Sequence, residues 1–160
     1  MREKRISRHS TYFVIVSLGI AVLALCILPP NSALADDITV SGNPGPLIVN
    51  SATAGFEPAA VSDATTTYGV DITTDNKKIT GEIDTAMPAQ TTLKVTLVAP
   101  SGATSMGQVT LSTSALNLVT GLLNGTNQSG LIMTYEFSAT VEAGVISSSS
   151  KTVTLTIADS

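Results

Sequence analysis

The sequence predicts an all-β fold in which two antiparallel sheets pack as a sandwich of about seven to nine strands. Short segments of alternating apolar and polar residues recur along most of the chain. Alternation with period two places the apolar side chains on one face of a strand. Glycine, proline and asparagine separate these segments, as turns require. A small closed barrel is the alternative architecture.

The first 35 residues have the pattern of a secretory signal peptide. Four basic residues precede an apolar run of 16 residues, Phe13–Leu28, which two prolines end. That run is shorter than the ~20 residues of a permanent membrane helix, and the small residues Ala33 and Ala35 match a cleavage site. The sequence therefore predicts secretion, cleavage after Ala35, and membrane contact only through this segment.

Two other fates of this segment stay open. Cys26 ends the stretch Leu-Ala-Leu-Cys, which is similar to a bacterial lipoprotein box, although Leu25 stands where a small residue is expected. Lipidation of Cys26 would tether the protein to a membrane surface. An uncleaved segment would remain as a membrane anchor. In either case the basic flank stays inside and the rest of the chain is exported.

Cleavage would leave a chain without the side chains that most catalytic and metal sites use. It would remove every arginine, the single histidine and the single cysteine, and leave four lysines against eleven acids, a formal net charge of −7. Zinc, haem and iron–sulfur sites would lack their usual ligands, and Ser-His-Asp or Cys-His arrangements could not form. We therefore expect no cofactor and no enzymatic activity. Because an acidic surface repels phosphate backbones, we also expect no nucleic-acid partner.

The exported part divides by pattern into two regions. Residues 36–66 are predicted as an N-terminal arm and linker, because apolar alternation is brief there and residues 50–66 show no sustained period. Residues 67–160 are predicted as the sandwich domain, because alternation is regular there. The first region is therefore a candidate for a role in assembly.

Four apolar residues of this arm are the candidate assembly residues. Ile38 and Val40 alternate with polar neighbours, and Leu47 and Val49 follow a break rich in glycine and proline. Such an arm can pair with its own domain, or add as a strand to the sheet edge of a neighbouring copy. Repetition of the second contact would build an open filament.

Alternation also places the strands of the sandwich domain. The predicted strands are 67–73, 78–84, 92–97, 109–111, 133–141 and 152–157. The first two predict a β-hairpin closed by a turn at residues 74–76. Residues 114–123 fit one helical turn and a kinked strand equally well. Asn124 and Gly125 predict a tight turn with positive φ.

Two groups of polar residues could carry chemistry. Asp71, Asp75 and Asn76 offer oxygen ligands for calcium, but Asp and Asn are also ordinary turn formers. Paired carboxylates could hydrolyse a glycoside, although the chain has no tryptophan to stack on a sugar. These carboxylates are Glu82, Asp84, Glu136 and Glu142. We assign no catalytic, cofactor-binding or metal residue to either group.

The signal, the Ala35-Asp36-Asp37 start, the Thr-rich strand 152–157 and the strand 131–141 resemble secreted bacterial Ig-like sandwich proteins, including strand-donating subunits of surface filaments or pili. The resemblance covers the whole exported region. It implies an extracellular, cell-surface structural subunit that polymerises with itself through residues 36–49. The alternative is a monomeric adhesion module that binds a cell-surface glycan or protein, and a small secreted hydrolase is a third hypothesis.

We predict that the exported protein begins at Asp36. Intact mass spectrometry of protein exported by cells that express the full-length chain should give the mass of residues 36–160. Replacing Ala35→Leu should slow processing, because the cleavage site requires a small residue there. A lipid-modified product that begins at Cys26, or an unprocessed chain, would contradict the prediction.

Overall fold

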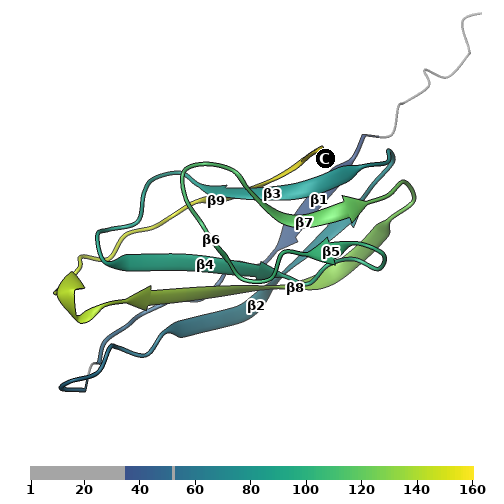
Figure 1. The fold of residues 1–160 in the computed structure, drawn as a ribbon. Coiled ribbons are helices and arrows are strands. Elements are labelled where there is room, and N and C mark those ends of the chain that lie inside the picture. The colour runs from purple at the N-terminus through teal and green to yellow at the C-terminus, as the bar shows by residue number, and fades with distance from the viewer. Residues whose placement is uncertain (1–34, 52) are drawn as a thin grey trace, which may run out of the picture. The chain divides into compact units, whose positions relative to one another are not determined.

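Two antiparallel sheets face each other in the computed structural model, which describes residues 35–51 and 53–160 (Figure 1). Sheet A has the strand order β1-β2-β8-β4-β6, and sheet B has the order β5-β7-β3-β9. The strands of sheet A are β1 (Asp37–Ser41), β2 (Val61–Asp71), β8 (Asn127–Ala139), β4 (Thr91–Leu97) and β6 (Val109–Thr110). Those of sheet B are β5 (Thr104–Ser105), β7 (Leu116–Leu122), β3 (Lys77–Ile83) and β9 (Val153–Asp159). The predicted all-β fold of two antiparallel sheets is confirmed.

A short 3₁₀ turn, η1 (Val141–Ala143), is the only helical element among the described residues. No helix in this part of the chain is long and apolar enough to cross a membrane. Ala33 and Cys26 lie outside the described residues, and Ala35 is exposed. Cleavage and lipidation therefore stay predictions.

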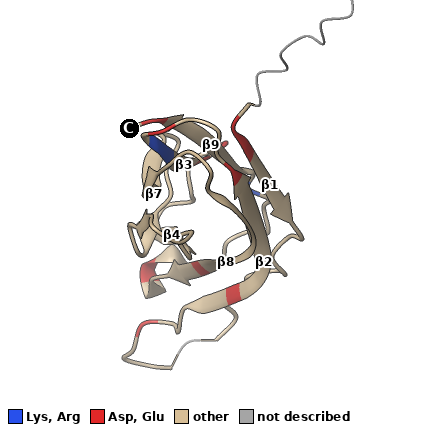
Figure 2. Cartoon of the chain, turned by 90° about the vertical axis from the view of Figure 1, so that its right-hand side faces the viewer, with Lys and Arg blue, Asp and Glu red and all other residues tan. Residues whose placement is uncertain are grey.

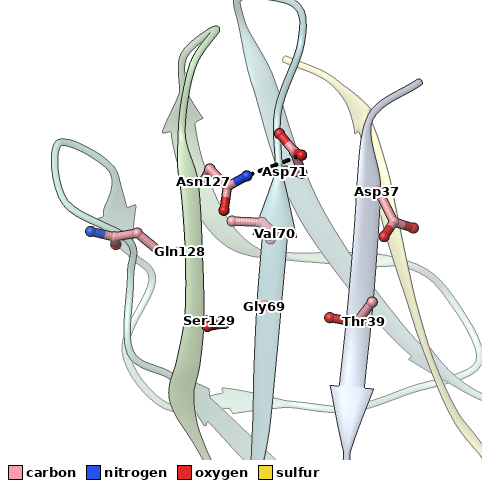
Figure 3. Close-up of a pocket in the computed structure, with 8 residues that line it drawn as sticks. All are labelled: Asp37, Thr39, Gly69, Val70, Asp71, Asn127, Gln128 and Ser129. Atoms are coloured by element: carbon pink, nitrogen blue, oxygen red, sulfur yellow. Dashed lines mark hydrogen bonds between the residues drawn. The ribbon is translucent and has the colours of Figure 1, made fainter. Parts of the chain in front are cut away.

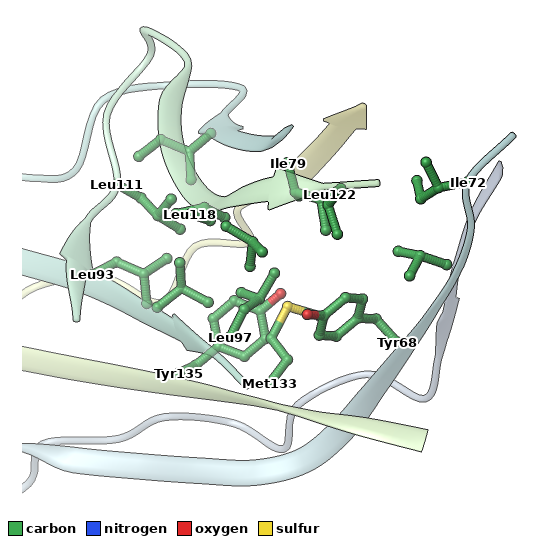
Figure 4. Close-up of a cluster of buried hydrophobic side chains, with 14 residues drawn as sticks. Tyr68, Ile72, Ile79, Leu93, Leu97, Leu111, Leu118, Leu122, Met133 and Tyr135 are labelled. Carbon is green, nitrogen blue, oxygen red and sulfur yellow. The ribbon is translucent and has the colours of Figure 1, made fainter. Parts of the chain in front are cut away.

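The core lies between the sheets and consists of the inward-facing members of the alternating strands (Figure 4). Val95 of β4 and Ile79 of β3 are completely buried on opposite sides of it. Each fully buried aliphatic side chain of this kind contributes about 1.5–3 kcal/mol relative to an exposed one. The Tyr68 hydroxyl donates a 2.6 Å hydrogen bond to the Val98 carbonyl, and burial raises the pKa of Tyr68 to about 12.

The predicted hairpin of residues 67–73 and 78–84 is wrong. β2 pairs with β1 and β8 in sheet A, whereas β3 pairs with β7 and β9 in sheet B, so the chain crosses between sheets after β2. Ile72 is the first residue after β2. Its amide donates to the Thr126 carbonyl, and its carbonyl accepts from the Gly125 amide, both at 2.8 Å. Alternation identifies the buried face of a strand but not its neighbour, and both strands bury their apolar face in the same core.

Three strands, β2, β7 and β8, differ from the predicted bounds or decide between the predicted alternatives. β2 begins at Val61, so residues 61–66 of the expected linker pair with β8. This part of β2 is mostly exposed because it extends beyond the core, and alternation therefore carries no signal there. Residues 116–122 form the kinked strand β7, with Gly121 at φ +75°. β8 (Asn127–Ala139) begins six residues before the predicted start at 133 and ends two residues before the predicted end at 141.

The predicted tight turn after β7 is confirmed. Gly125 has φ +84°, in the region that favours glycine. This turn takes the chain from sheet B back to sheet A, as the crossing at Ile72 takes it from sheet A to sheet B. The two crossings are joined by the hydrogen bonds of Ile72.

Replacing Ile79→Ala should lower the free energy of unfolding by about 2–5 kcal/mol, because it leaves a cavity between the sheets. The matched control is Ile132→Ala on β8, where the side chain is 46% exposed and truncation should cost less than about 1 kcal/mol. Denaturant titration measures both values. Equal losses in the two variants would contradict this assignment of the core.

Candidate functional site

The N-terminal arm, residues 36–49, lies along the edge of β2 that faces away from β8, in its own domain (Figure 1). Its first half is β1, whose only strand partner in the described structure is β2. The register pairs Asp37 with Asp71 and ends with Ser41 opposite Thr67. Within a single chain, the arm therefore completes the edge of sheet A.

The four candidate assembly residues are not equally buried. Ile38 and Leu47 are half-buried and pack against the core cluster. Val49 is also half-buried, whereas Val40 is 51% exposed. Ile38 opposes Val70 and Val40 opposes Tyr68 across the ladder. The apolar contribution to holding the arm therefore comes mainly from Ile38 and Leu47, in addition to the backbone pairing.

Beyond Ser41 the ladder between the arm and β2 stops. Pro44 and Pro46 have no backbone N–H to donate to a neighbouring strand. One contact with a side chain continues the attachment: the Gly45 amide donates to Asp63 Oδ2 at 3.3 Å. The Thr65 hydroxyl and amide, followed by the Gly45 amide, lower the pKa of Asp63. The second half of the arm therefore has fewer hydrogen bonds to β2 than β1 has.

A cluster of polar contacts fixes the first residue of the arm. The Asp36 carboxylate accepts hydrogen bonds from the Thr73 amide at 2.7 Å and from the Thr74 hydroxyl at 2.8 Å. Lys77 Nζ lies 3.3 Å from Asp36 Oδ2 and 2.6 Å from Asp159 Oδ1. We call Asp36, Thr73, Thr74 and Lys77 the Asp36 clamp. Figure 2 shows the basic start of β3 near the acidic C-terminal end of β9.

The Asp36 clamp stabilises the ionised form of its carboxylate. The Thr73 amide contributes most, and the hydroxyls of Thr74 and Thr73 and the Lys77 ammonium add to it, so the pKa of Asp36 lies well below its usual value of 3.8 despite desolvation. The clamp was missed in the sequence because Thr73 lies 37 residues from Asp36. The chain folds the start of the arm against the connection that follows β2.

The three residues considered as calcium ligands each have another role in the structure. Asp71 Oδ2 accepts from Asn127 Nδ2 at 3.1 Å, and Asp75 Oδ1 accepts from the Asn124 amide at 2.8 Å. Asn76 has φ +60°, a turn conformation that asparagine tolerates. Within residues 35–51 and 53–160, no three His, Cys, Asp or Glu side chains come together in a way that could hold a metal ion.

Of the four carboxylates considered for hydrolysis, Glu82 and Asp84 lie two residues apart at the end of β3, and Glu136 and Glu142 lie on other elements. Glu82 belongs to β3 in sheet B, and Asp84 follows that strand and accepts from the Thr152 amide at 3.1 Å. Glu136 belongs to β8 in sheet A and pairs with Lys94 at 3.3 Å. Glu142 lies in η1. The structure therefore places Glu82 and Glu136 in different sheets.

A shallow depression of about 170 Å³ lies over β1, β2 and β8 (Figure 3). It lies at Gly69, where the β2–β8 register shifts and where an added β-carbon would lie 3.1 Å from Thr39 Oγ1 and 3.2 Å from the Gln128 carbonyl oxygen. Asp37, Asp71 and Asn127 are among its polar lining residues. Its volume is below the ~300–1,000 Å³ of typical ligand pockets. A glycine within a predicted strand is the sequence signal that could have indicated this irregularity.

Replacing Asp36→Asn should lower the melting temperature at neutral pH by weakening the clamp. Because the folded pKa of Asp36 is depressed, its stabilisation is fully present above the usual value of 3.8 and is lost as pH falls below it. The difference between variant and wild type should therefore shrink in acid. Asp37→Asn is the control: Asp37 opposes Asp71, so this change should leave stability equal or higher. Calorimetry at pH 7 and pH 3 tests both, and an equal fall in the two variants would contradict the role of Asp36.

Comparison with known proteins gives no relative for this chain. No protein family model matches it. No curated protein and no solved structure matches it either. The observations that bear on function are therefore the geometry of the arm, the Asp36 clamp and the sheet edges.

Proposed function

We propose that this chain is a non-enzymatic extracellular structural subunit with an immunoglobulin-like sandwich, and that it assembles into a surface filament by exchanging its arm between copies. The observation that carries the proposal is the position of the arm on the free edge of β2. Every contact that the arm makes with its own β2 is available from the β2 of an identical copy. Exchange would therefore conserve the contacts while linking two molecules.

Apart from the Asp36 clamp, few contacts hold the arm. Four of the five residues of β1 are exposed, and the prolines limit the ladder beyond it. Release of the arm would expose only a few half-buried apolar side chains, among them Ile38 and Leu47. Cleavage after Ala35 would make the arm a free chain end, which could leave without threading through the fold.

The connection between the arm and β2 gives the exchange its reach. Residues 50–60 separate the two, and eleven residues span up to about 36 Å when extended. They contain a turn closed by a 2.9 Å hydrogen bond from the Phe56 amide to the Thr53 carbonyl, with Gly55 at φ +83°. Opening this connection would direct the arm to the next copy. Each copy gives one arm and receives another. When the donor and the receiver are different copies and the rotation between neighbours does not close a ring, the contact propagates into an open filament.

A second candidate function is a monomeric adhesion module for a cell-surface glycan or protein. An exposed apolar group favours it: Phe56 is 70% exposed, and Val141 and Val145 of the η1 region are 56% and 104% exposed. The Val141 amide donates to Glu57 Oε2 at 2.8 Å, which joins the loop of Phe56 to η1. In this case the arm would remain with its own domain, and the protein would stay monomeric.

The two candidates differ in whether the arm pairs within or between chains. Ser41 and Thr67 are opposite partners, and opposite residues of an antiparallel pair have Cα atoms about 4.5–5.5 Å apart, which suits a disulfide. We expect the double variant Ser41→Cys/Thr67→Cys, oxidised after assembly at high concentration, to give a ladder of covalent oligomers on non-reducing gels. The single variant Ser41→Cys is the control and should give no species beyond a dimer.

Two outcomes decide against arm exchange. An oxidised double variant that runs only as a monomer shows that the arm pairs within its own chain. A chain lacking residues 36–49 that still forms filaments in electron micrographs shows that another contact is the joint. A monomer whose oligomeric state does not change, but which binds oligosaccharide unless Phe56 is replaced by serine, would support the adhesion module.

A further inference from the structure

The C-terminal strand β9 forms a long open edge of sheet B. Its only strand partner in the part of the chain that the structure describes is β3. The opposite edge strand of the same sheet, β5, has two residues, and so does the edge strand β6 of sheet A. β9 has seven residues, Val153–Asp159, and contains neither lysine nor proline. Proteins usually shorten or charge such an edge to prevent pairing with another chain, and β9 has neither protection along its centre.

The backbone of β9 presents hydrogen-bonding groups on this edge. The Asp84 amide donates to the Thr152 carbonyl at 3.0 Å, and the Ser160 amide donates to the Asn76 carbonyl at 2.8 Å. In an antiparallel ladder, alternate residues point their amide and carbonyl toward the same neighbour. The backbone amides and carbonyls of the even-numbered residues of β9 therefore point toward β3. The odd-numbered residues Val153, Leu155 and Ile157 direct their backbone groups toward the open edge.

The side chains of β9 also fit a further strand. Val153, Leu155 and Ile157 face the core but are only half-buried, because the core ends at this edge. Thr154 and Thr156 are exposed on the outer face. A strand added to the edge would cover the three apolar side chains and would meet threonines on the other face. Its own sequence should therefore alternate apolar and polar residues.

We propose that this strand is the β9 of a second copy, paired antiparallel about a two-fold axis at Leu155. In this register Leu155 opposes itself, Val153 opposes Ile157, and Thr154 opposes Thr156. Lys151, two residues before the strand, then opposes Asp159, the last residue of the strand. The result is an isologous dimer in which sheet B continues from one copy into the other.

Charge complementarity selects this register. The Asp159 side chain is 87% exposed, and its Oδ1 pairs with Lys77 of the same chain at 2.6 Å. Among the described residues, Lys151 Nζ donates to two uncharged groups, the Thr85 hydroxyl and the Ala86 carbonyl, both at 2.8 Å. The centred register brings each Lys151 to an Asp159 of the other copy, twice per dimer. A shift that places Leu155 opposite Val153 leaves Lys151 opposite Ile157. A shift the other way leaves Asp159 opposite Val153.

The β9 contact differs from arm exchange in its geometry. It uses the opposite sheet, it closes on itself after two copies, and it needs no release of any segment. Combined with an open chain of exchanged arms, it would join two filaments side by side. Its test is therefore made with the Ser41→Cys/Thr67→Cys variant in its oxidised form. We use preparations that run as a covalent monomer on non-reducing gels, because in these the arm is held in its own domain.

Two matched variants of that protein test the register. In Thr154→Lys/Thr156→Lys, each lysine faces a lysine of the other copy, so we expect the dimer dissociation constant from sedimentation equilibrium to rise at least tenfold. In Thr154→Lys/Thr156→Glu, each lysine faces a glutamate, so the dimer should be as tight as that of the locked parent or tighter. Both threonines are exposed, and circular dichroism with thermal unfolding checks that the fold is kept.

Three results overturn the proposal. The first is a locked parent that stays monomeric at millimolar concentration. The second is a lysine–lysine variant that dimerises as tightly as the parent. The third is a lysine–glutamate variant weakened as much as the lysine–lysine variant, since a shifted register would place like charges opposite each other. Failure of arm exchange changes none of these readings, because the locked arm takes no part in them.

Discussion

The structure depends on one constraint: each sheet can bury only one face, and both sheets bury it in the same core. Val95 and Ile79, one from each sheet, are completely buried. A β-carbon on Gly81 would lie 2.6 Å from Leu118 Cδ1, so the Leu118 side chain of β7 packs over this glycine of β3. No cysteine lies in the described part of the chain. Cohesion therefore comes from burial and ladder hydrogen bonds, and both of these end at the sheet edges.

The same constraint explains how much of the fold could be predicted. Where a strand crosses the core, alternation identifies it, as for Leu93, Val95 and Leu97 of β4, all of them buried. Where a strand extends beyond the core, alternation disappears, and the start of β2 at Val61 was missed. The pairing of strands is not encoded in one strand's pattern, because β2 and β3 show similar faces and join different sheets.

The candidate site was predictable in outline only. The apolar pattern identified Ile38 and Leu47 as the residues through which the arm packs on the domain. It gave no sign of the Asp36 clamp, since a carboxylate near a chain end has no periodicity and Thr73 and Lys77 are distant in sequence. Val40 differs from Ile38 in its burial within the single chain. It shares the face of Ile38, but its position at the edge leaves it half exposed.

Lys77 contacts both the arm at one edge of sheet A and β9 at one edge of sheet B. Its ammonium group contacts Asp36 at the start of the arm and Asp159 at the end of β9, and both carboxylates raise its pKa, Asp159 the more strongly. If the arm leaves, Lys77 loses its ion pair with Asp36 and keeps only its ion pair with Asp159. Lys151 of a second copy would then compete with Lys77 for the Asp159 carboxylate. An arm from another copy restores the missing carboxylate. Any coupling through this lysine is reciprocal. The free energy by which arm pairing changes the stability of β9 pairing would therefore equal the free energy by which β9 pairing changes the stability of arm pairing.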